Sequence, residues 1–164
     1  MEITVKLIVI ILATFLTGLS AGLCFTWSNA VTTGLANLDD LGYLRAFQQM
    51  NRTILNPTFF LVFFGPVFLG GLGAFLTRNA HPTTFWLVFT ATLLYFFGVG
   101  LVTVFGNVPL NELVDKAELA ETGVEAAASL REKFENPWNT YHYVRTYISA
   151  LSFLLLLVSL IWKS

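Results

Sequence analysis

Four long apolar runs without a charged residue are the feature that most constrains this chain. They occupy residues 7–25, 59–76, 83–105 and 146–162 of the 164 residues. Each approaches or reaches the roughly 20 residues with which an α-helix crosses a bilayer, where a charged side chain is costly. A soluble domain of this size cannot bury so much apolar surface, because 55% of the residues are hydrophobic and the mean hydropathy is +0.70. The sequence therefore predicts a protein whose solvent is largely lipid.

The pattern predicts an all-α fold, an integral membrane four-helix bundle with two amphipathic connecting helices on one face. We expect a single transmembrane domain over residues 1–164. Its membrane helices are expected at about 5–27, 57–77, 83–106 and 140–162.

The two long connections are predicted to be amphipathic helices at about 40–55 and 110–134. In the first, Leu44, Phe47 and Ile54 recur at helical spacing opposite polar residues. Its start is expected to be capped by Asp39 or Asp40. Two asparagines are further candidate helix caps, because Asn56 precedes Pro57 and Asn107 stands two residues before Pro109.

The distribution of charge predicts the orientation in the membrane. Lys6, Arg78 and Lys163 fall on one side of the four predicted spans, whereas the two long connections on the other side are rich in acidic residues. Because basic residues gather on the cytoplasmic side, we expect a multi-pass protein of the cell (inner) membrane with both termini in the cytoplasm.

Composition argues against several function classes. A formal net charge of −1 is not that of a nucleic-acid-binding protein. The single cysteine, Cys24, excludes an intramolecular disulfide and disfavours a cysteine-based metal site. His81 and His142 fall on opposite membrane faces, which disfavours haem or iron ligation by both, and no nucleotide-binding fingerprint is present. We therefore expect no cofactor and no metal.

Polar side chains gather where the long connections meet the membrane helices. Since both connections lie on one face, the sequence predicts that these side chains converge there. Trp27 follows the first span, and Asn51 precedes the second. The others follow the third span or precede the fourth: Asn107, Asn111, Glu112, Asn136, Trp138, Asn139, His142 and Arg145.

The densest group is at the start of the fourth span. Trp138, His142, Arg145 and Ser149 follow one another at intervals of four, three and four residues, which places them on one face of a helix. A histidine suits proton transfer near neutral pH. Structural roles stay open: the tryptophans as an interfacial belt, and Arg145 as a partner of Glu112 or of lipid headgroups.

An ordered set of short motifs then resembles the anthrone-oxygenase-like family, which are small four-helix membrane proteins, many of them bacterial. The resemblance runs over nearly the whole chain. Its motifs are Gly22-Leu-Cys-Phe-Thr-Trp27-Ser-Asn-Ala-Val31, Phe47-Gln-Gln-Met-Asn51, Asn56-Pro57, Asn107-Val-Pro-Leu-Asn111, and Trp138-Asn139 with His142 and Arg145-Thr146.

This resemblance implies oxidation of anthrones to anthraquinones by molecular oxygen, with no evident metal or flavin. His142 matches the family's histidine and is the expected base. Arg145, Asn139 and Asn111 are expected to stabilise an oxyanion, and Trp27 and Trp138 to stack on a flat substrate. Asn51, Asn107, Glu112 and Asn136 complete the predicted substrate-binding set.

Two other function classes remain open. The chain is alternatively a non-catalytic accessory or scaffold subunit of a membrane complex, or a binder of a quinone or another hydrophobic ring compound. Expected partners are the lipid bilayer and a hydrophobic aromatic ligand, and partner membrane subunits or a homo-oligomer are also open. A closed apolar pocket beneath His142 favours an enzyme or binder, whereas a filled interior favours a scaffold.

Overall fold

The computed structural model describes residues 4–79 and 82–162, and these form helices and no strands. In chain order the helices are α1 (Val5–Thr26), η1 (Trp27–Val31), α2 (Thr32–Ala36), α3 (Asp40–Ile54), α4 (Pro57–Thr77), α5 (Pro82–Tyr95), η2 (Phe96–Leu101), η3 (Thr103–Asn107), α6 (Val108–Asp115) and α7 (Val124–Ile161). In the described residues, four continuous helical stretches are long and apolar enough to cross a membrane: Val5–Ala36, Pro57–Thr77, Pro82–Asp115 and Val124–Ile161. The predicted all-α membrane bundle is confirmed.

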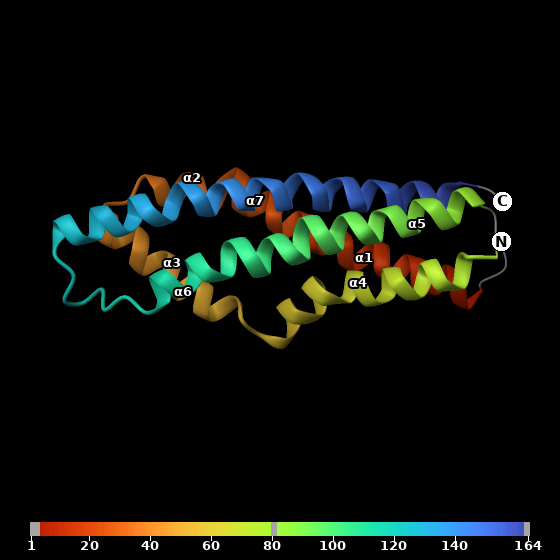
Figure 1. Cartoon of the computed structure of the whole chain (residues 1–164), viewed down its shortest axis with the longest axis horizontal. Coiled ribbons are helices and arrows are strands. Elements are labelled where there is room, and N and C mark those ends of the chain that lie inside the picture. Colours follow the sequence, from red (N-terminus) through yellow and green to blue (C-terminus); the bar gives the residue numbers. More distant parts are fainter. Residues whose placement is uncertain (1–3, 80–81, 163–164) are drawn as a thin grey trace.

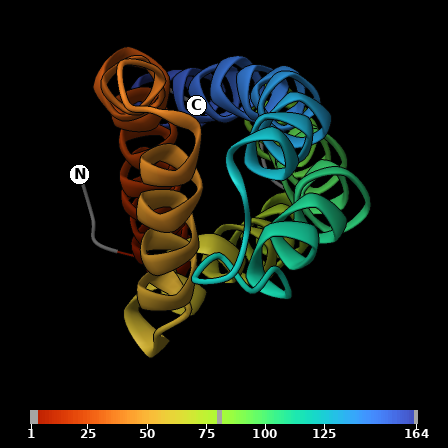
Figure 2. The same ribbon diagram turned by 90° about the vertical axis from the view of Figure 1, so that its left-hand side faces the viewer.

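Three of these stretches are longer than a membrane is thick. With 32, 34 and 38 residues they extend for about 48–57 Å, against a hydrocarbon core of about 30 Å. The excess lies at one end of the bundle, with α3 packed beside it (Figure 1). We call this end, formed by α2, α3, α6 and residues 124–138, the head. Figure 2 looks along the bundle from the head and shows its helices grouped around a common axis.

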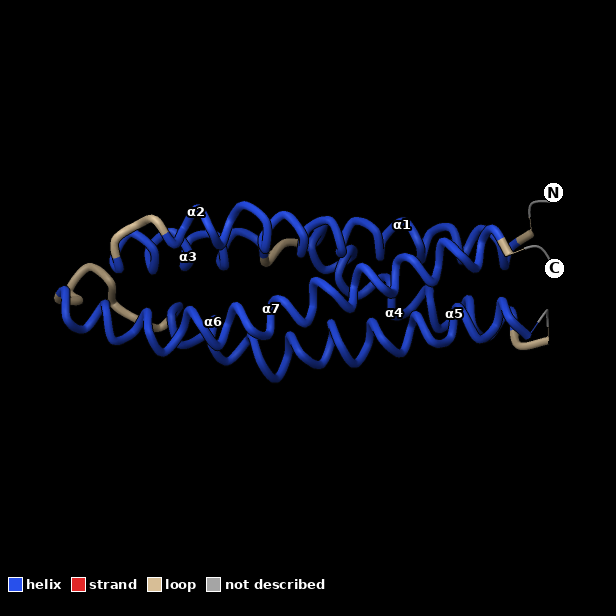
Figure 3. Tube along the Cα trace, turned by 90° about the horizontal axis from the view of Figure 1, so that it is seen from above, coloured by secondary structure: helices blue, strands red, loops and turns tan. Residues whose placement is uncertain are grey.

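α4 is shorter than the other three because the chain breaks before it. The side chain of Asn56 accepts a hydrogen bond from the backbone N–H of Phe59 at 3.0 Å, and Pro57 occupies the first turn. The expected cap at Asn56 is therefore confirmed. The break lies partway along the bundle, where α3 leaves and α4 enters (Figure 3). The space next to this break is therefore bounded both by helices of the head and by the rest of the bundle, which we call the membrane part.

The predicted single amphipathic helix over 110–134 is wrong. α6 ends at Asp115, and α7 begins at Val124 after a connection that includes the buried Leu119. The cause is a contact from α3, because the amide nitrogen of Gln48 donates to the carbonyls of Val114, Asp115 and Ala117 at 3.0–3.2 Å. These carbonyls lie at the helix end, where the helix itself supplies no donors.

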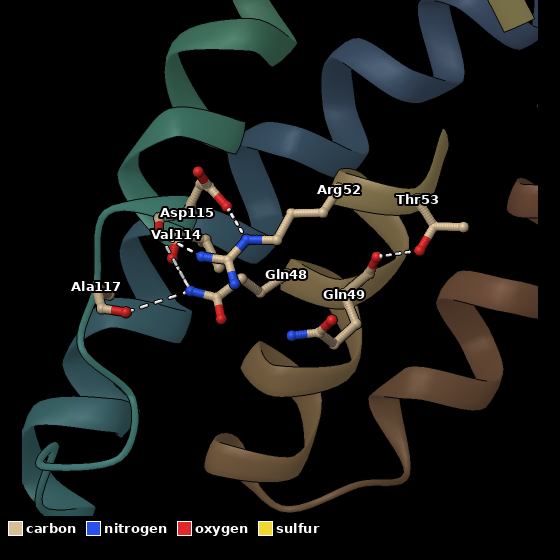
Figure 4. Close-up of polar contacts among 7 residues, drawn as sticks. All are labelled: Gln48, Gln49, Arg52, Thr53, Val114, Asp115 and Ala117. Carbon is tan, nitrogen blue, oxygen red and sulfur yellow. Dashed lines mark hydrogen bonds and ion pairs between the residues drawn. The ribbon is translucent and has the colours of Figure 1, made fainter. Parts of the chain in front are cut away.

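Arg52 completes this contact one turn further along α3. Its guanidinium forms an ion pair with the Asp115 carboxylate and also donates to the Asp115 carbonyl, as Figure 4 shows. Both partners are half-exposed, so the ion pair itself contributes little to stability. Its effect is to fix where α6 ends and how α3 lies against it.

The helix that contains the predicted fourth span, 140–162, begins earlier, at Val124. α7 continues through Pro137, whose ring leaves the carbonyl of Lys133 without its helical donor. Both residues are exposed on the head, where water can satisfy that carbonyl. The first and third spans, expected to end near 27 and 106, likewise continue into the head as far as Ala36 and Asp115.

Arg131 ties α7 to the connection between α2 and α3. Its guanidinium donates to Asp40 at 3.1 Å, to Glu135 at 2.7 Å and to the Leu38 carbonyl at 2.9 Å. It also lies 4.3 Å from the ring centre of Tyr43, in the hydrophobic core of the head. This arginine is matched by two carboxylates and by backbone acceptors, which is typical of a structural residue.

The head lies opposite the start of α1 and the end of α7 (Figure 1). Asp39 caps α3 through its side chain, which accepts from the N–H of Gly42 at 2.6 Å, so this expected cap is confirmed. Asn107 makes no side-chain cap hydrogen bond to α6, and that expectation was wrong. Two residues used in the sequence analysis, His81 and Lys163, lie outside the described residues.

Candidate functional site

A cavity of about 180 Å³ lies where the head meets the membrane part of the bundle. One water molecule needs roughly 10–15 Å³ on the same measure, so the space suits a ligand of several rings. Most of its lining is aromatic or aliphatic. The polar side chains in the lining come from α1, α3, η3, α6 and α7: Ser20, Asn51, Thr103, Asn111, His142 and Arg145.

His142 lies at this cavity with both ring nitrogens engaged. Nε2 is 3.1 Å from the carbonyl oxygen of Cys24, and Nδ1 is 2.8 Å from a terminal nitrogen of Arg145. A carbonyl only accepts and a guanidinium only donates, so Nε2 carries the proton and Nδ1 accepts. The imidazole is 3% exposed and stacks on Trp138, with ring centres 4.8 Å apart. The geometry thus holds a neutral imidazole in one tautomer.

Arg145 lies one turn further along α7 and is held by neutral groups. Besides His142, it donates to the hydroxyl of Thr103 at 3.2 Å. The Cζ atom of its guanidinium lies 5.5 Å from the centre of the Trp138 ring. Its Nε atom is buried and has no hydrogen-bond partner in the part of the chain that the structure describes. The guanidinium therefore has donor capacity that the described chain does not use.

Local helix geometry explains how residues from different helices reach the same cavity. On α7, Trp138, His142 and Arg145 follow one another at intervals of four and three residues and so share one face. Trp27 and Thr103 lie in the π-helical segments η1 and η3. Wider turns of this kind are frequent at functional sites, because they shift the angular position of the side chains that follow.

Three aromatic rings form the wall on the head side. Trp27 and Trp138 have ring centres 5.6 Å apart, and Phe47 lies 5.0 Å from Trp138 and 5.8 Å from Trp27. The indole N–H of Trp138 donates to the side-chain oxygen of Asn111 at 2.7 Å. Asn111 thus fixes the orientation of the tryptophan on which His142 stacks.

Tyr95 is 1% exposed and contacts Ser20 and Phe63, two residues of the cavity lining. Its hydroxyl lies 2.6 Å from the hydroxyl of Ser20 and donates to the carbonyl of Phe63 at 3.1 Å. These bonds join α5 to α1 and to α4. The bond to α4 is made three residues before Pro66, which lies within that helix. Tyr95 therefore contributes to the site indirectly, by holding α1, α4 and α5 together.

The cavity is open on the side between the start of α4 and η3. Several of its lining residues are also exposed on the bundle surface: Leu55 is 57% exposed, Phe60 43%, Phe64 44% and Val104 47%. Phe60, Phe64 and Val104 belong to helical stretches that can cross a membrane, so this opening faces lipid.

Six of the ten predicted site residues line the same cavity: Trp27, Asn51, Asn111, Trp138, His142 and Arg145. The other four do not line it. Asn107 is fully buried and donates to the Trp138 carbonyl, and Asn139 has a buried side-chain oxygen without a partner in the described chain. Asn136 is exposed, and Glu112 pairs with Lys116 at 2.8 Å and not with Arg145.

Sequence reasoning missed the residues that support His142 and Arg145 from the other helices. Thr103 accepts from Arg145, the Cys24 carbonyl accepts from His142, and Ser20 bonds Tyr95. Thr103 stands one helical turn before Asn107, which was a usable indication. Cys24 takes part through its backbone carbonyl, and no pattern of side chains in the sequence indicates such a backbone contact.

The described residues contain no group of three histidine, cysteine, aspartate or glutamate side chains that could hold a metal ion. The polar groups at the cavity are instead hydrogen-bond donors and acceptors around one fixed cation. Such a set can orient a ligand oxygen and accept a proton at Nδ1 of His142 once that atom is free.

Comparison with known proteins gives one match. The model of a family described as anthrone oxygenase matches residues 59–155, which covers more than half of the chain and includes Thr103, Asn111, Trp138, His142 and Arg145. No curated protein and no solved structure matches the chain significantly.

Proposed function

The chain belongs to the anthrone oxygenase family, and from that premise we propose that it is a membrane-embedded oxygenase for a hydrophobic aromatic substrate of the anthrone or quinol type. The observation that carries the proposal is the pairing of His142 with Arg145 at an aromatic-walled cavity. A base beside a fixed cation suits removal of a proton from a methylene that is conjugated with a carbonyl through the rings.

The flat substrate would lie against Trp27 and Trp138, with its carbonyl oxygen toward Arg145. When the guanidinium turns from Nδ1 of His142 to this oxygen, it polarises the carbonyl and releases the lone pair of Nδ1. Nδ1 then removes one proton from the ring methylene, and the electron pair of that C–H bond becomes the enolate. Asn111 acts through Trp138, which it orients, and Asn139 has no part in this scheme.

The enolate carbon is electron-rich enough to react with molecular oxygen. One C–O bond forms, the imidazolium returns its proton to the outer oxygen, and loss of water leaves a second carbonyl. The overall change is one CH₂ group and one O₂ converted to one C=O group and one H₂O. Oxygen is the only oxidant that the balance requires.

Oxygen uptake by the purified protein tests this proposal. With 1,8-dihydroxyanthrone as substrate, His142→Ala should lower the protein-dependent rate by about 10² or more, the usual contribution of a positioned base. Asn136→Ala is the matched control, because this exposed residue lies on the same helix but does not line the cavity. A folded His142→Ala protein with unchanged uptake would exclude the imidazole as the base.

A second candidate, a binder of a quinone or a similar ring compound, is favoured by one observation. Both nitrogens of His142 are occupied by Cys24 and Arg145, so no base is free until the arginine moves. A binder would retain the ring compound and consume no oxygen. Quenching of tryptophan fluorescence by the ring compound, together with an oxygen electrode, separates the two functions.

We also propose that the protein lies in the cell (inner) membrane with both termini in the cytoplasm. In support, Lys6 and Arg78 lie at the end opposite the acid-rich head. A cysteine introduced at Glu121 should react with a membrane-impermeant maleimide from outside, and one at Arg78 should not. Cys24 is buried and gives little background. The reverse pattern of labelling would invert the orientation.

A further inference from the structure

The charge of Arg145 is not balanced by any acidic side chain of the described chain. Each ion pair in that part of the protein joins other residues: Arg52 with Asp115, Lys116 with Glu112, and Arg131 with Asp40 and Glu135. The remaining exposed arginines, Arg45 and Arg78, donate to backbone carbonyls at the protein surface.

Arg145 differs because it lies inside the bundle on a helix that can cross a membrane. A charge in such a place is costly unless it is paired or hydrogen-bonded throughout. Thr103 and the neutral His142 satisfy two donors, and the face of Trp138 adds a modest attraction. The buried Nε remains without an acceptor in the described chain. The position is thus electrostatically suited to an anion.

The surroundings restrict which anion fits. The cavity lining consists mainly of aromatic and aliphatic side chains, which include the stacked rings of Phe59 and Phe63 on α4. Such a lining favours a flat, apolar ring system over a small hydrated ion. One oxyanion on an aromatic body satisfies both parts of the cavity.

We propose that the cavity binds its aromatic ligand already ionised, as a carboxylate or an acidic phenolate whose oxygen pairs with Arg145. This inference rests on the proposed site and goes beyond the proposed reaction, in which charge only develops after proton removal. His142 then also acts as a positioning residue, because its Nδ1 holds the guanidinium toward the cavity.

A matched pair of probes tests the charge requirement in the absence of oxygen. Anthraquinone-2-carboxylate and anthraquinone-2-carboxamide have nearly the same shape and differ in charge. In nanodiscs of uncharged lipid at pH 7, quenching of tryptophan fluorescence should show the carboxylate binding at least about tenfold more tightly, the ratio expected for a hydrogen bond to a charged group. Equal affinities for the two probes would overturn the proposal.

Variants assign that preference to Arg145. Arg145→Gln should remove the preference, so that the carboxylate and the carboxamide bind with similar affinity, whereas Arg145→Lys should retain part of it. Arg78→Gln is the control, because this exposed arginine follows the last residue of α4 and does not line the cavity. A preference that survives in folded Arg145→Gln protein would contradict the assignment. If the Arg145→Gln protein does not fold, the Arg145→Lys protein still tests the assignment, because its preference for the carboxylate should be reduced.

Oleate distinguishes an aromatic ligand from a lipid-derived one. It carries the same carboxylate on an aliphatic chain, and it should displace bound anthraquinone-2-carboxylate only at much higher concentration. Displacement by oleate at an equal concentration would overturn the aromatic part of the proposal. Since no turnover is measured, charge-selective binding without oxygen uptake would refute the proposed oxygenase and leave this inference standing.

Discussion

Arg131 and Arg145 lie on the same helix, two turns on either side of Trp138, and their surroundings differ in kind. In the head, Arg131 meets two carboxylates, backbone carbonyls and the ring of Tyr43. At the cavity, Arg145 meets a threonine hydroxyl, a neutral imidazole and an indole face. The first arginine has its bonding capacity used within the fold, whereas the second has a buried donor, Nε, without a partner in the described chain. On our proposal this contrast separates a structural arginine from one that binds a ligand.

The largest effect on stability is expected from replacing Arg131, whose charge is paired with carboxylates within the fold. Arg131→Gln leaves Asp40 and Glu135 unpaired beside the head core, and should lower the free energy of unfolding by about 2–3 kcal/mol. Unfolding by SDS in mixed micelles measures this change. Probe affinity at the cavity should stay the same once the folded fraction is taken into account. A loss below about 0.5 kcal/mol would mean that the head does not depend on this arginine.

A smaller loss is expected from replacing Tyr95. Tyr95→Phe removes the hydroxyl that bonds Ser20 and the Phe63 carbonyl, and should cost about 1 kcal/mol, within the range for hydrogen bonds in membrane proteins. Although Tyr95 lies next to the site, its hydroxyl is fully used, so it should behave like a head residue in the same unfolding assay. An effect on oxygen uptake with unchanged stability would instead place Tyr95 in the reaction.

Arg145→Gln should change stability least of these substitutions. Removing an uncompensated buried charge is neutral or slightly stabilising, so the expected change is within about 1 kcal/mol. The same variant should lose charge-selective binding. Arg131→Gln should therefore change stability but not probe binding, and Arg145→Gln should change probe binding but hardly stability. A destabilisation as large as that of Arg131→Gln would show that Arg145 is structural, and the comparison would fail.

The four helices and most of the site followed from sequence because they depend on local patterns. Uncharged runs predict spans, and intervals of three and four residues predicted the shared face of Trp138, His142 and Arg145. The end of α6 did not follow, because Gln48 and Arg52 on another helix fix it. The pair of Glu112 with Lys116 has i,i+4 spacing and was open to prediction from the sequence.

High pH gives a weaker test of the head. Burial raises the pKa of the Tyr43 phenol well above its ordinary value of about 10, and the nearby Glu135 adds to this. Because the folded protein resists ionisation of this group, the stabilising contribution is complete below pH 10 and is lost as the pH rises above it. Tyr43→Phe should reduce the loss of unfolding free energy between pH 9 and pH 11 by about 1 kcal/mol, measured by SDS titration. An identical loss in both proteins would assign the alkaline sensitivity to other groups.

The most direct test is a structure of the protein with a bromine-labelled anthraquinone-2-carboxylate, located by the anomalous scattering of bromine. The account predicts the rings against Trp27 and Trp138, with a carboxylate oxygen within hydrogen-bond distance of the Arg145 guanidinium. Bromine density away from this cavity, or a ligand whose carboxylate points away from Arg145 toward the lipid opening, would contradict it.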